Sequence, residues 1–222
     1  MKEALMQKNT FLSSEGDSWF TRNKSTETVD VPEGYQFYAK FLKPGQRILE
    51  IGCSFGKNLQ YFYETVGCEC YGIDPSRKAV DYGKSLYPAI AFSVGTTDKL
   101  DFPDGFFDFV LFGFCLYLVD RTLLSKTVAE ADRVLKDKGF LGITDFDSKY
   151  PRKREYKHYE GLASYKMDYS RLFLVFPHFS MADKYCFSHS SDCFVEDPGD
   201  RVASVVLFKD NLGESAYFPQ ED

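Results

Sequence analysis

The stretch RILEIGCSFGKNL, residues 47–59, constrains the fold more than any other part of this 222-residue chain. It begins as a short aliphatic run that reaches Glu50 and Ile51. Two glycines follow, Gly52 and Gly56, and the pattern then resumes with the apolar spacing of a helix. A buried strand that passes into a helix through a glycine turn is typical of α/β folds that bind a nucleotide at the turn.

Strand-like and helix-like segments alternate through the middle of the chain. The predicted strands are 47–51, 68–73, 89–94, 107–114 and 140–144. The predicted helices are 57–66, 75–86 and 120–137, the last beginning at a capping Asp120 and ending before Gly139. Alternation at this spacing predicts an α/β fold with a mostly parallel sheet that helices cover on both faces.

The two flanks of this region depart from the alternation. Residues 1–45 are polar and mixed, except for an amphipathic segment at 18–23 and a predicted helix at 32–43. Residues 145–180 are irregular, aromatic and basic, and two strand-like runs follow at 184–189 and 201–208. No helical pattern separates those runs, so we expect an antiparallel last pair. The prediction is therefore a Rossmann-like sheet of about seven strands in residues 46–222, with 145–180 as an insertion and 1–45 as a separate N-terminal unit.

The composition and net charge of the chain disfavour several classes of function. The net charge of −6 disfavours an extended nucleic-acid surface, so a nucleic-acid partner is not expected. No apolar stretch approaches the roughly 20 residues that cross a bilayer, and the N-terminal residues lack the apolar core of a signal peptide. The six cysteines match no zinc spacing: they stand at 53, 68, 70, 115, 186 and 193. We expect a reduced cytoplasmic protein with no metal and no membrane association.

The glycine turn does not match the dinucleotide fingerprint G-x-G-x-x-G. Counted from Gly52, Ser54 stands where the second glycine belongs and Lys57 where the third belongs. Glu50, at the end of the strand, would repel a pyrophosphate but attract a cation or an amine. Asp74 closes the next strand 24 residues later, where an acid can accept the hydroxyls of a ribose. An NAD-linked enzyme is therefore disfavoured.

From about Phe41 to Phe146 the chain resembles the class I S-adenosylmethionine-dependent methyltransferases. ILEIGCSFG resembles the glycine loop of that family, and CYGIDPS its ribose-binding strand end. VGTTDKLDFPDGFFDFVLFGFCLYLVD resembles the adenine loop and fourth strand, and ADRVLKDKGFLGI the turn before the fifth strand. The resemblance implies S-adenosyl-L-methionine as cofactor, S-adenosyl-L-homocysteine as product, and a small-molecule acceptor.

The resemblance also implies roles for single residues. Glu50 would hold the methionine amine and Asp74 the ribose, while Trp19 and Arg22 of an N-terminal lid would cover the cofactor and pair with its carboxylate. The other expected cofactor-binding residues are Gly52, Cys53, Ser54, Gly56, Pro75, Thr96, Thr97, Phe112, Gly113 and Phe114.

Methyl transfer from a sulfonium is an in-line displacement, and a base is needed only where the acceptor must lose a proton. We expect transfer to oxygen of a small polar metabolite, such as a sugar, a nucleotide-sugar or a carboxylate, with His158 or Tyr117 as the base. The insertion 145–180 would form the acceptor pocket, with an anion clamp and stacking rings at Arg152, Arg154, Tyr156, Tyr159, Tyr165 and Tyr169. Three alternatives stay open: the basic run is a solvated loop, the acceptor is RNA, or the protein binds the cofactor without catalysis. The oligomeric state is not predicted.

Overall fold

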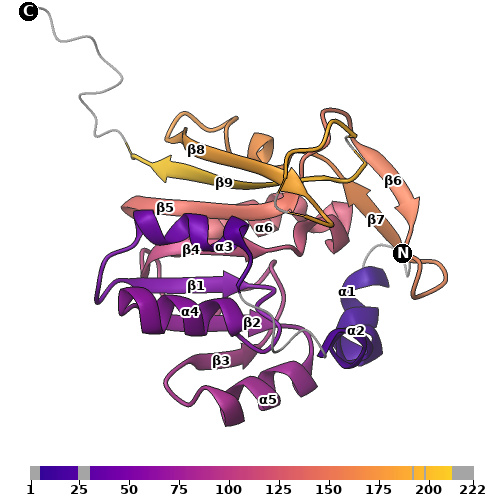
Figure 1. Ribbon diagram of the computed structural model, residues 1–222, viewed down its shortest axis with the longest axis horizontal. Helices are drawn as coiled ribbons and strands as arrows, with labels where there is room; N and C mark the ends of the chain where they lie inside the picture. Colours follow the sequence, from indigo (N-terminus) through magenta and orange to yellow (C-terminus); the bar gives the residue numbers. More distant parts are fainter. Residues whose placement is uncertain (1–5, 25–30, 192, 198, 212–222) are drawn as a thin grey trace, which may run out of the picture.

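A computed structural model of the chain describes residues 6–24, 31–191, 193–197 and 199–211. Its centre is a seven-stranded sheet in the order β3-β2-β1-β4-β5-β9-β8 (Figure 1). The strands are β1 Arg47–Ile51, β2 Glu69–Asp74, β3 Ala91–Val94, β4 Phe107–Gly113, β5 Leu135–Phe146, β8 Phe179–Ser188 and β9 Arg201–Lys209. The first five are parallel, and β9 is antiparallel to both β5 and β8. The predicted mostly parallel sheet with an antiparallel last pair is confirmed.

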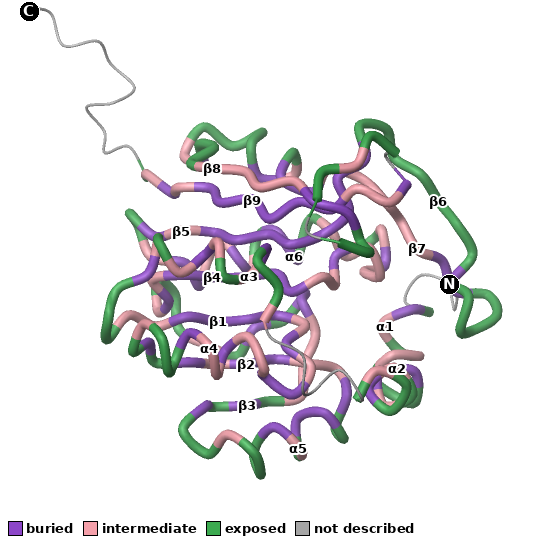
Figure 2. Tube along the Cα trace, viewed as in Figure 1, coloured by how far each residue is buried: buried purple, intermediate pink, exposed green. Residues whose placement is uncertain are grey.

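Helical elements cover both faces of the sheet. One face carries α3 (Glu33–Gln36), the 3₁₀ turn Phe37–Phe41, α4 (Lys57–Val66) and α5 (Arg77–Leu86). The other face carries α6 (Leu124–Val134) and the 3₁₀ turn Tyr169–Leu172. The strands form the buried centre of the molecule, and the helices turn their outer sides to solvent (Figure 2).

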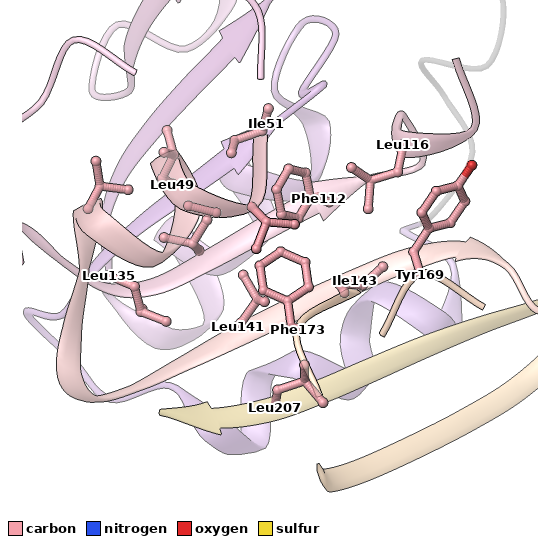
Figure 3. Close-up of a cluster of buried hydrophobic side chains, with 14 of the residues drawn as sticks. Leu49, Ile51, Phe112, Leu116, Leu135, Leu141, Ile143, Tyr169, Phe173 and Leu207 are labelled. Carbon is pink, nitrogen blue, oxygen red and sulfur yellow. The ribbon is translucent and has the colours of Figure 1, made fainter. Parts of the chain in front are cut away.

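Strand β4 shows how the sequence divides between the two cores. Successive side chains of a strand point to opposite faces. Phe109 and Leu111 accordingly pack with α4, whereas Val110 and Phe112 pack with α6. Phe112 is fully buried and its ring lies 6.0 Å from that of Phe173 (Figure 3). Burying a side chain of this size stabilises the fold by about 1.5–3 kcal/mol.

Two predicted helices differ from the observed ones. The segment 120–137 forms a 3₁₀ turn at Arg121–Leu123 followed by α6, and Leu135 already belongs to β5, where it pairs with Phe107. The segment 32–43 forms only α3 and the following 3₁₀ turn. Asp120 does not cap a helix that follows it. Its two carboxylate oxygens instead accept the backbone N–H groups of Gln7 and Lys8, 113 and 112 residues away.

Two further units lie at the carboxyl edge of the parallel strands. The first, which we call the N-terminal segment, consists of α1 (Met6–Thr10), a π-helical turn at Phe11–Glu15 and α2 (Gly16–Asn23). The second is a separate hairpin of β6 (Arg152–Glu155) and β7 (Ala163–Lys166), which the sequence did not predict as strands. The N-terminal segment stands beside the strand ends and the hairpin stands farther out (Figure 1). None of the helices in the described ranges is long and apolar enough to span a membrane.

Candidate cofactor and acceptor site

A cavity of about 290 Å³ opens at the carboxyl edge of the sheet, beneath the N-terminal segment. The ends of β1, β2 and β4 form its floor, and α1, the π-helical turn and α2 contribute the opposite wall. A ligand site at the carboxyl ends of the strands is the rule for open α/β sheets. The cavity is therefore the candidate site.

The glycine turn after β1 has the backbone shape that the sequence pattern predicts. Gly52 and Gly56 have φ angles of +81° and +86°, in the left-handed region that glycine adopts without strain. A Cβ atom at Gly56 would lie 2.3 Å from the Phe92 ring, so this position also has no room for a side chain. Ser54 replaces a family glycine, yet it too has a positive φ of +50°. The loop therefore keeps a glycine-like path with serine at its centre.

Asp74 ties this loop to the end of β2. Its two carboxylate oxygens accept the backbone N–H groups of Ser54 and Ser76, each at 2.8 Å. Burial raises the pKa of Asp74 to about 6. The cap of α5 is Ser76, whose hydroxyl oxygen accepts the N–H of Ala79. Because each carboxylate oxygen can accept a second hydrogen bond, Asp74 both shapes the loop and presents acceptors to the cavity that it lines.

Glu50 lies just behind the cavity wall. Its Oε1 accepts a hydrogen bond of 2.8 Å from the side-chain amide of Asn58, which lines the cavity. Its Oε2 is buried and has no hydrogen-bond partner among the described residues. Burial raises the pKa of Glu50 to about 8, with a smaller contribution from Asp74. A Cβ atom at Gly113 would lie 2.5 Å from Oε1, so a glycine here leaves space for the carboxyl group. A buried carboxyl group with an unused oxygen is suited to a cationic ligand.

The loop after β3 closes the other end of the cavity. Thr96 and Thr97 line it together with Asp98. The hydroxyl of Thr96 donates to Asp98 at 2.8 Å, and Asp98 forms a 2.8 Å ion pair with Lys8 of the N-terminal segment. The loop is thus fixed to the wall that covers it.

The end of β4 contributes aromatic residues, but not all those predicted. Gly113, Phe114 and Tyr117 line the cavity, and Phe114 has a positive φ of +54°. The Phe114 and Tyr117 rings lie 5.3 Å apart. The assignment of Phe112 to the cofactor site is corrected: it shares the α6 face of β4 with Val110, away from the cavity. The period of two along the strand would have shown this.

Of the lid residues that the sequence singled out, one lines the cavity. Trp19 does so, as do Phe11 and Phe20 of the same segment. Arg22 does not; its guanidinium forms a 2.5 Å ion pair with the buried Glu15. The pairing of Arg22 with the methionine carboxylate is therefore corrected, because the side chain is committed to Glu15 on the other side of the helix.

The acceptor pocket predicted in residues 145–180 is not where the cavity lies. None of the predicted side chains of this insertion belongs to the cavity lining. Strand β6 is exposed along its length (Figure 2). Arg152 and Arg154 lie on it, and His158 and Tyr159 are exposed on the turn that follows.

The three remaining tyrosines that were predicted for the acceptor pocket are structural. The buried hydroxyl of Tyr156 donates to Glu15 at 3.0 Å. The Tyr169 hydroxyl donates to the carbonyl of Tyr165, and the Tyr165 ring stacks on Arg121. The catalytic role of His158 and the anion clamp are corrected for one physical reason: the N-terminal segment occupies the space between hairpin and cavity.

The sequence reading missed several lining residues that come from outside the family motifs. Gln7, Lys8 and Phe11 belong to the N-terminal segment, and Tyr35 belongs to α3. Gln7 binds across the site, donating to the Leu118 carbonyl and accepting from the Ala163 N–H. Burial raises the pKa of Tyr35 well above its ordinary value, and Glu50 adds to the rise. No signal in the sequence marks these residues, because their partners are more than 100 positions away or in another element.

Comparison with known proteins shows which proteins the chain resembles. Residues 49–143 match the family model of a methyltransferase domain. An uncharacterized methyltransferase of Synechocystis sp. is 29% identical over 104 residues, covering 47% of this chain and 49% of the relative. The sterol 24-C-methyltransferase of Schizosaccharomyces pombe is 29% identical over 139 residues, covering 55% of this chain and 35% of the relative. The chain thus spans less than half the length of these curated relatives.

A solved structure matches nearly the whole chain. It is the 1,6-didemethyltoxoflavin-N1-methyltransferase of Burkholderia thailandensis, with its acceptor and S-adenosylhomocysteine bound. The TM-score is 0.72 at 18% sequence identity, covering 94% of this chain and 91% of that chain. At this identity the likeness shows the shared fold.

Proposed function

Since this chain belongs to the class I S-adenosylmethionine-dependent methyltransferases, we propose that it transfers a methyl group from that cofactor to a small-molecule acceptor in the cavity. The observation that carries the proposal is the unpaired, buried Oε2 of Glu50 behind a glycine turn of the required shape. A dinucleotide would bring a pyrophosphate to this point, which would oppose ionisation of the buried Glu50. An ammonium or sulfonium group would satisfy the carboxyl group instead.

The described residues fit the cofactor along its length. Asp74 would accept the ribose hydroxyls, and the loop Thr96–Asp98 would lie over the adenine. Asn58 and Glu50 would hold the methionine amine. Lys57, at the first turn of α4, takes over the role expected of Arg22 and would hold the methionine carboxylate.

The bound cofactor supplies an already activated methyl group. The protein's contribution is then to align the acceptor and to exclude water. Phe11 and Trp19 would cover the site from the N-terminal segment. Phe114 and Tyr117 follow β4, which neighbours β1 on the side away from the ribose-binding β2, so they would face the reacting end.

A small molecule is the acceptor that these features favour. The cavity has a volume of about 290 Å³, and the basic run that kept RNA as an alternative lies on the hairpin outside its lining. Relatives act on small acceptors too, by name a sterol, phosphoethanolamine and didemethyltoxoflavin. Transfer to oxygen, expected from the sequence, requires a base or an already ionised oxygen. The residues that line the cavity therefore bear on which acceptor atom can react.

Calorimetry tests the proposal. The protein should bind S-adenosylmethionine and S-adenosylhomocysteine but not NADH. Asp74→Asn keeps the size of the side chain and removes its charge, and it should weaken cofactor binding by about 1.5–3 kcal/mol, the range for a hydrogen bond to a charged group. Asp81→Asn, on the outer side of α5, is the matched control and should bind as wild type. NADH binding without a response to the sulfonium would refute the proposal.

A further inference from the structure

The cavity has an aromatic side that the cofactor assignments do not use. We define it as the rings of Phe11, Tyr35, Phe114 and Tyr117, which come from the N-terminal segment, α3 and the end of β4. The groups that surround these rings restrict which acceptors can react there. The inference below rests on the proposed function and names its class of substrate.

Among the described residues, the cavity lining holds no histidine, and its carboxylates all have hydrogen-bond or ion-pair partners. Three aspartates line it, and each is already used. Asp74 accepts two backbone N–H groups beside the ribose position. Asp98 is paired with Lys8, and Asp120 accepts the N–H groups of Gln7 and Lys8. An aliphatic hydroxyl or an ammonium group must lose a proton to become nucleophilic, and each of these carboxylates already holds backbone N–H groups or a lysine.

The phenols and thiols of the lining cannot replace that base. Burial raises the pKa of Tyr35 and Tyr117 well above the ordinary value of a phenol. It raises the pKa of the Cys53 and Cys115 thiols as well. All four groups therefore stay protonated near neutral pH and are not in the ionised form that could take up a proton.

In the part of the chain that the structure describes, the lining also offers no further cation for an acceptor that is already an anion. Its two charged amines are Lys8 and Lys57. Lys8 is paired with Asp98 at 2.8 Å, and Lys57 has an interaction of its own and is assigned above to the methionine carboxylate. A carboxylate or phenolate acceptor would enter a site with three aspartates in its wall, of which Asp98 is paired with a lysine. Like charges at short range disfavour such a ligand.

We propose that the acceptor is a flat, uncharged nitrogen heterocycle, methylated on a ring nitrogen whose lone pair is free at neutral pH. The lone pair forms the bond to the methyl carbon, the bond from that carbon to sulfur breaks, and its electron pair stays on sulfur. The positive charge passes from the sulfonium to the heterocycle, and no proton has to leave during the transfer.

The residues around the cavity can stabilise the positive charge of the methylated product. A cation is stabilised over the faces of Phe and Tyr rings, and the nearby carboxyl groups add to the attraction. The Phe114 ring is held in place by Tyr117 at 5.3 Å and by Phe146 at 5.0 Å. Its positive φ is a strained backbone conformation for a residue other than glycine, and such strain is concentrated at functional sites.

Binding of charge-matched probes tests the proposal without relying on turnover. The protein is first loaded with S-adenosylhomocysteine, and N-methylquinolinium, 1-naphthol and 1-naphthoate are then titrated by calorimetry. These two-ring probes carry charges of about +1, 0 and −1 near pH 7. The cation should bind at least about tenfold more tightly than the anion, with 1-naphthol between them. Equal affinities, the reverse order, or no binding of the cation would overturn the proposal.

Two variants separate recognition of charge from recognition of shape. Phe114→Leu removes a ring and should lower the affinity for the cation severalfold while changing that for 1-naphthol by less than about twofold. Tyr117→Phe keeps its ring and should retain the preference for the cation. An equal loss of affinity for both probes in Phe114→Leu would mean that the site recognises the shape of the probe and not its charge, which contradicts the proposal. If S-adenosylhomocysteine itself does not bind, the proposed function fails as well, so the two failures are distinguishable.

Discussion

The N-terminal segment and the β6–β7 hairpin are two additions at the same edge of the sheet, and the chain uses them differently. Both carry aromatic and charged side chains. The N-terminal segment is anchored to the site: Gln7 and Lys8 bind Asp120, and Asp17 accepts from Ser76 and from the Lys78 N–H. The hairpin instead packs on the segment from outside, and β6 is exposed along its length. The amino-acid composition of the two units is therefore not enough to tell which one lines the cavity and which one packs behind it.

The largest expected effect comes from removing the rings that the N-terminal segment places over the cavity. The double variant Phe11→Ala/Trp19→Ala should weaken S-adenosylmethionine binding by at least about tenfold, since one buried aromatic contact contributes about 1.5–3 kcal/mol. Arg152→Ala/Arg154→Ala is the matched change on the hairpin and should leave the affinity within about twofold. A larger loss in the hairpin variant, measured by calorimetry, would reverse the comparison.

The junction between the two units should show a smaller effect, on stability. Tyr156→Phe removes the hydroxyl that donates to the buried Glu15, and it should lower the free energy of unfolding by about 1.5–3 kcal/mol. Tyr159→Phe, on the exposed turn of the same hairpin, should change it by less than about 0.5 kcal/mol. Urea unfolding measures both values. Equal values for the two variants would show that the hairpin is not supported through Glu15.

A pH dependence follows from the raised carboxyl pKa values in the cavity wall. The pKa of Glu50 is about 8 and that of Asp74 about 6 without a ligand, and a bound cation favours the ionised forms. Cofactor affinity should therefore rise between pH 6 and 8, by at most about tenfold per pH unit, with release of a proton on binding. The fluorescence of Trp19, the single tryptophan, would follow the titration.

The stability of the ligand-free protein should change in the opposite direction. Because folding raises the pKa of Glu50, its contribution to stability is complete below about pH 4.5 and is lost as the pH rises through about 8. Glu50→Gln should flatten both profiles. An affinity that is constant or falls from pH 6 to 8 would contradict the assignment of Glu50.

The smallest expected effect concerns the histidine that the sequence favoured as a base. His158→Gln should leave turnover within about twofold of wild type, because the side chain is exposed on the turn of the hairpin. His178→Gln is the control, since that histidine pairs with Asp132 beside α6 and far from the cavity in the fold. A selective loss in His158→Gln would mean that the hairpin closes over the acceptor after all.

The sequence predicted those parts of the protein whose signals are local. Strand and helix periodicity gave the sheet and its antiparallel end, and the glycine turn with Glu50 and Asp74 gave the floor of the site. Phe112 was assigned wrongly to the cofactor site, although the period of two along the strand places it on the α6 face with Val110. Asp120 shows what local patterns cannot contain. It has the residue type and position of a helix cap, but it binds a segment 112 residues earlier in the chain.

The lining residues from the N-terminal segment and α3 could not be predicted in this way, because contacts between residues far apart in the sequence place them at the cavity. Tyr35 lies in a four-residue helix with no motif around it, and only the folded chain brings it beside Glu50 and Cys115. His158 stood among tyrosines in the segment expected to vary with the acceptor, and nothing in its neighbours showed that the hairpin points outward. The direction of a hairpin is set by what packs beneath it, here Phe11 and Glu15.

Hydrogen–deuterium exchange with and without S-adenosylhomocysteine tests most directly whether the site lies beneath the N-terminal segment. We predict that the ligand slows exchange in residues 6–23 and in the glycine turn 52–58, while the hairpin 152–166 exchanges as before. Protection confined to the hairpin, or no protection of residues 6–23 at saturating ligand, would contradict the account.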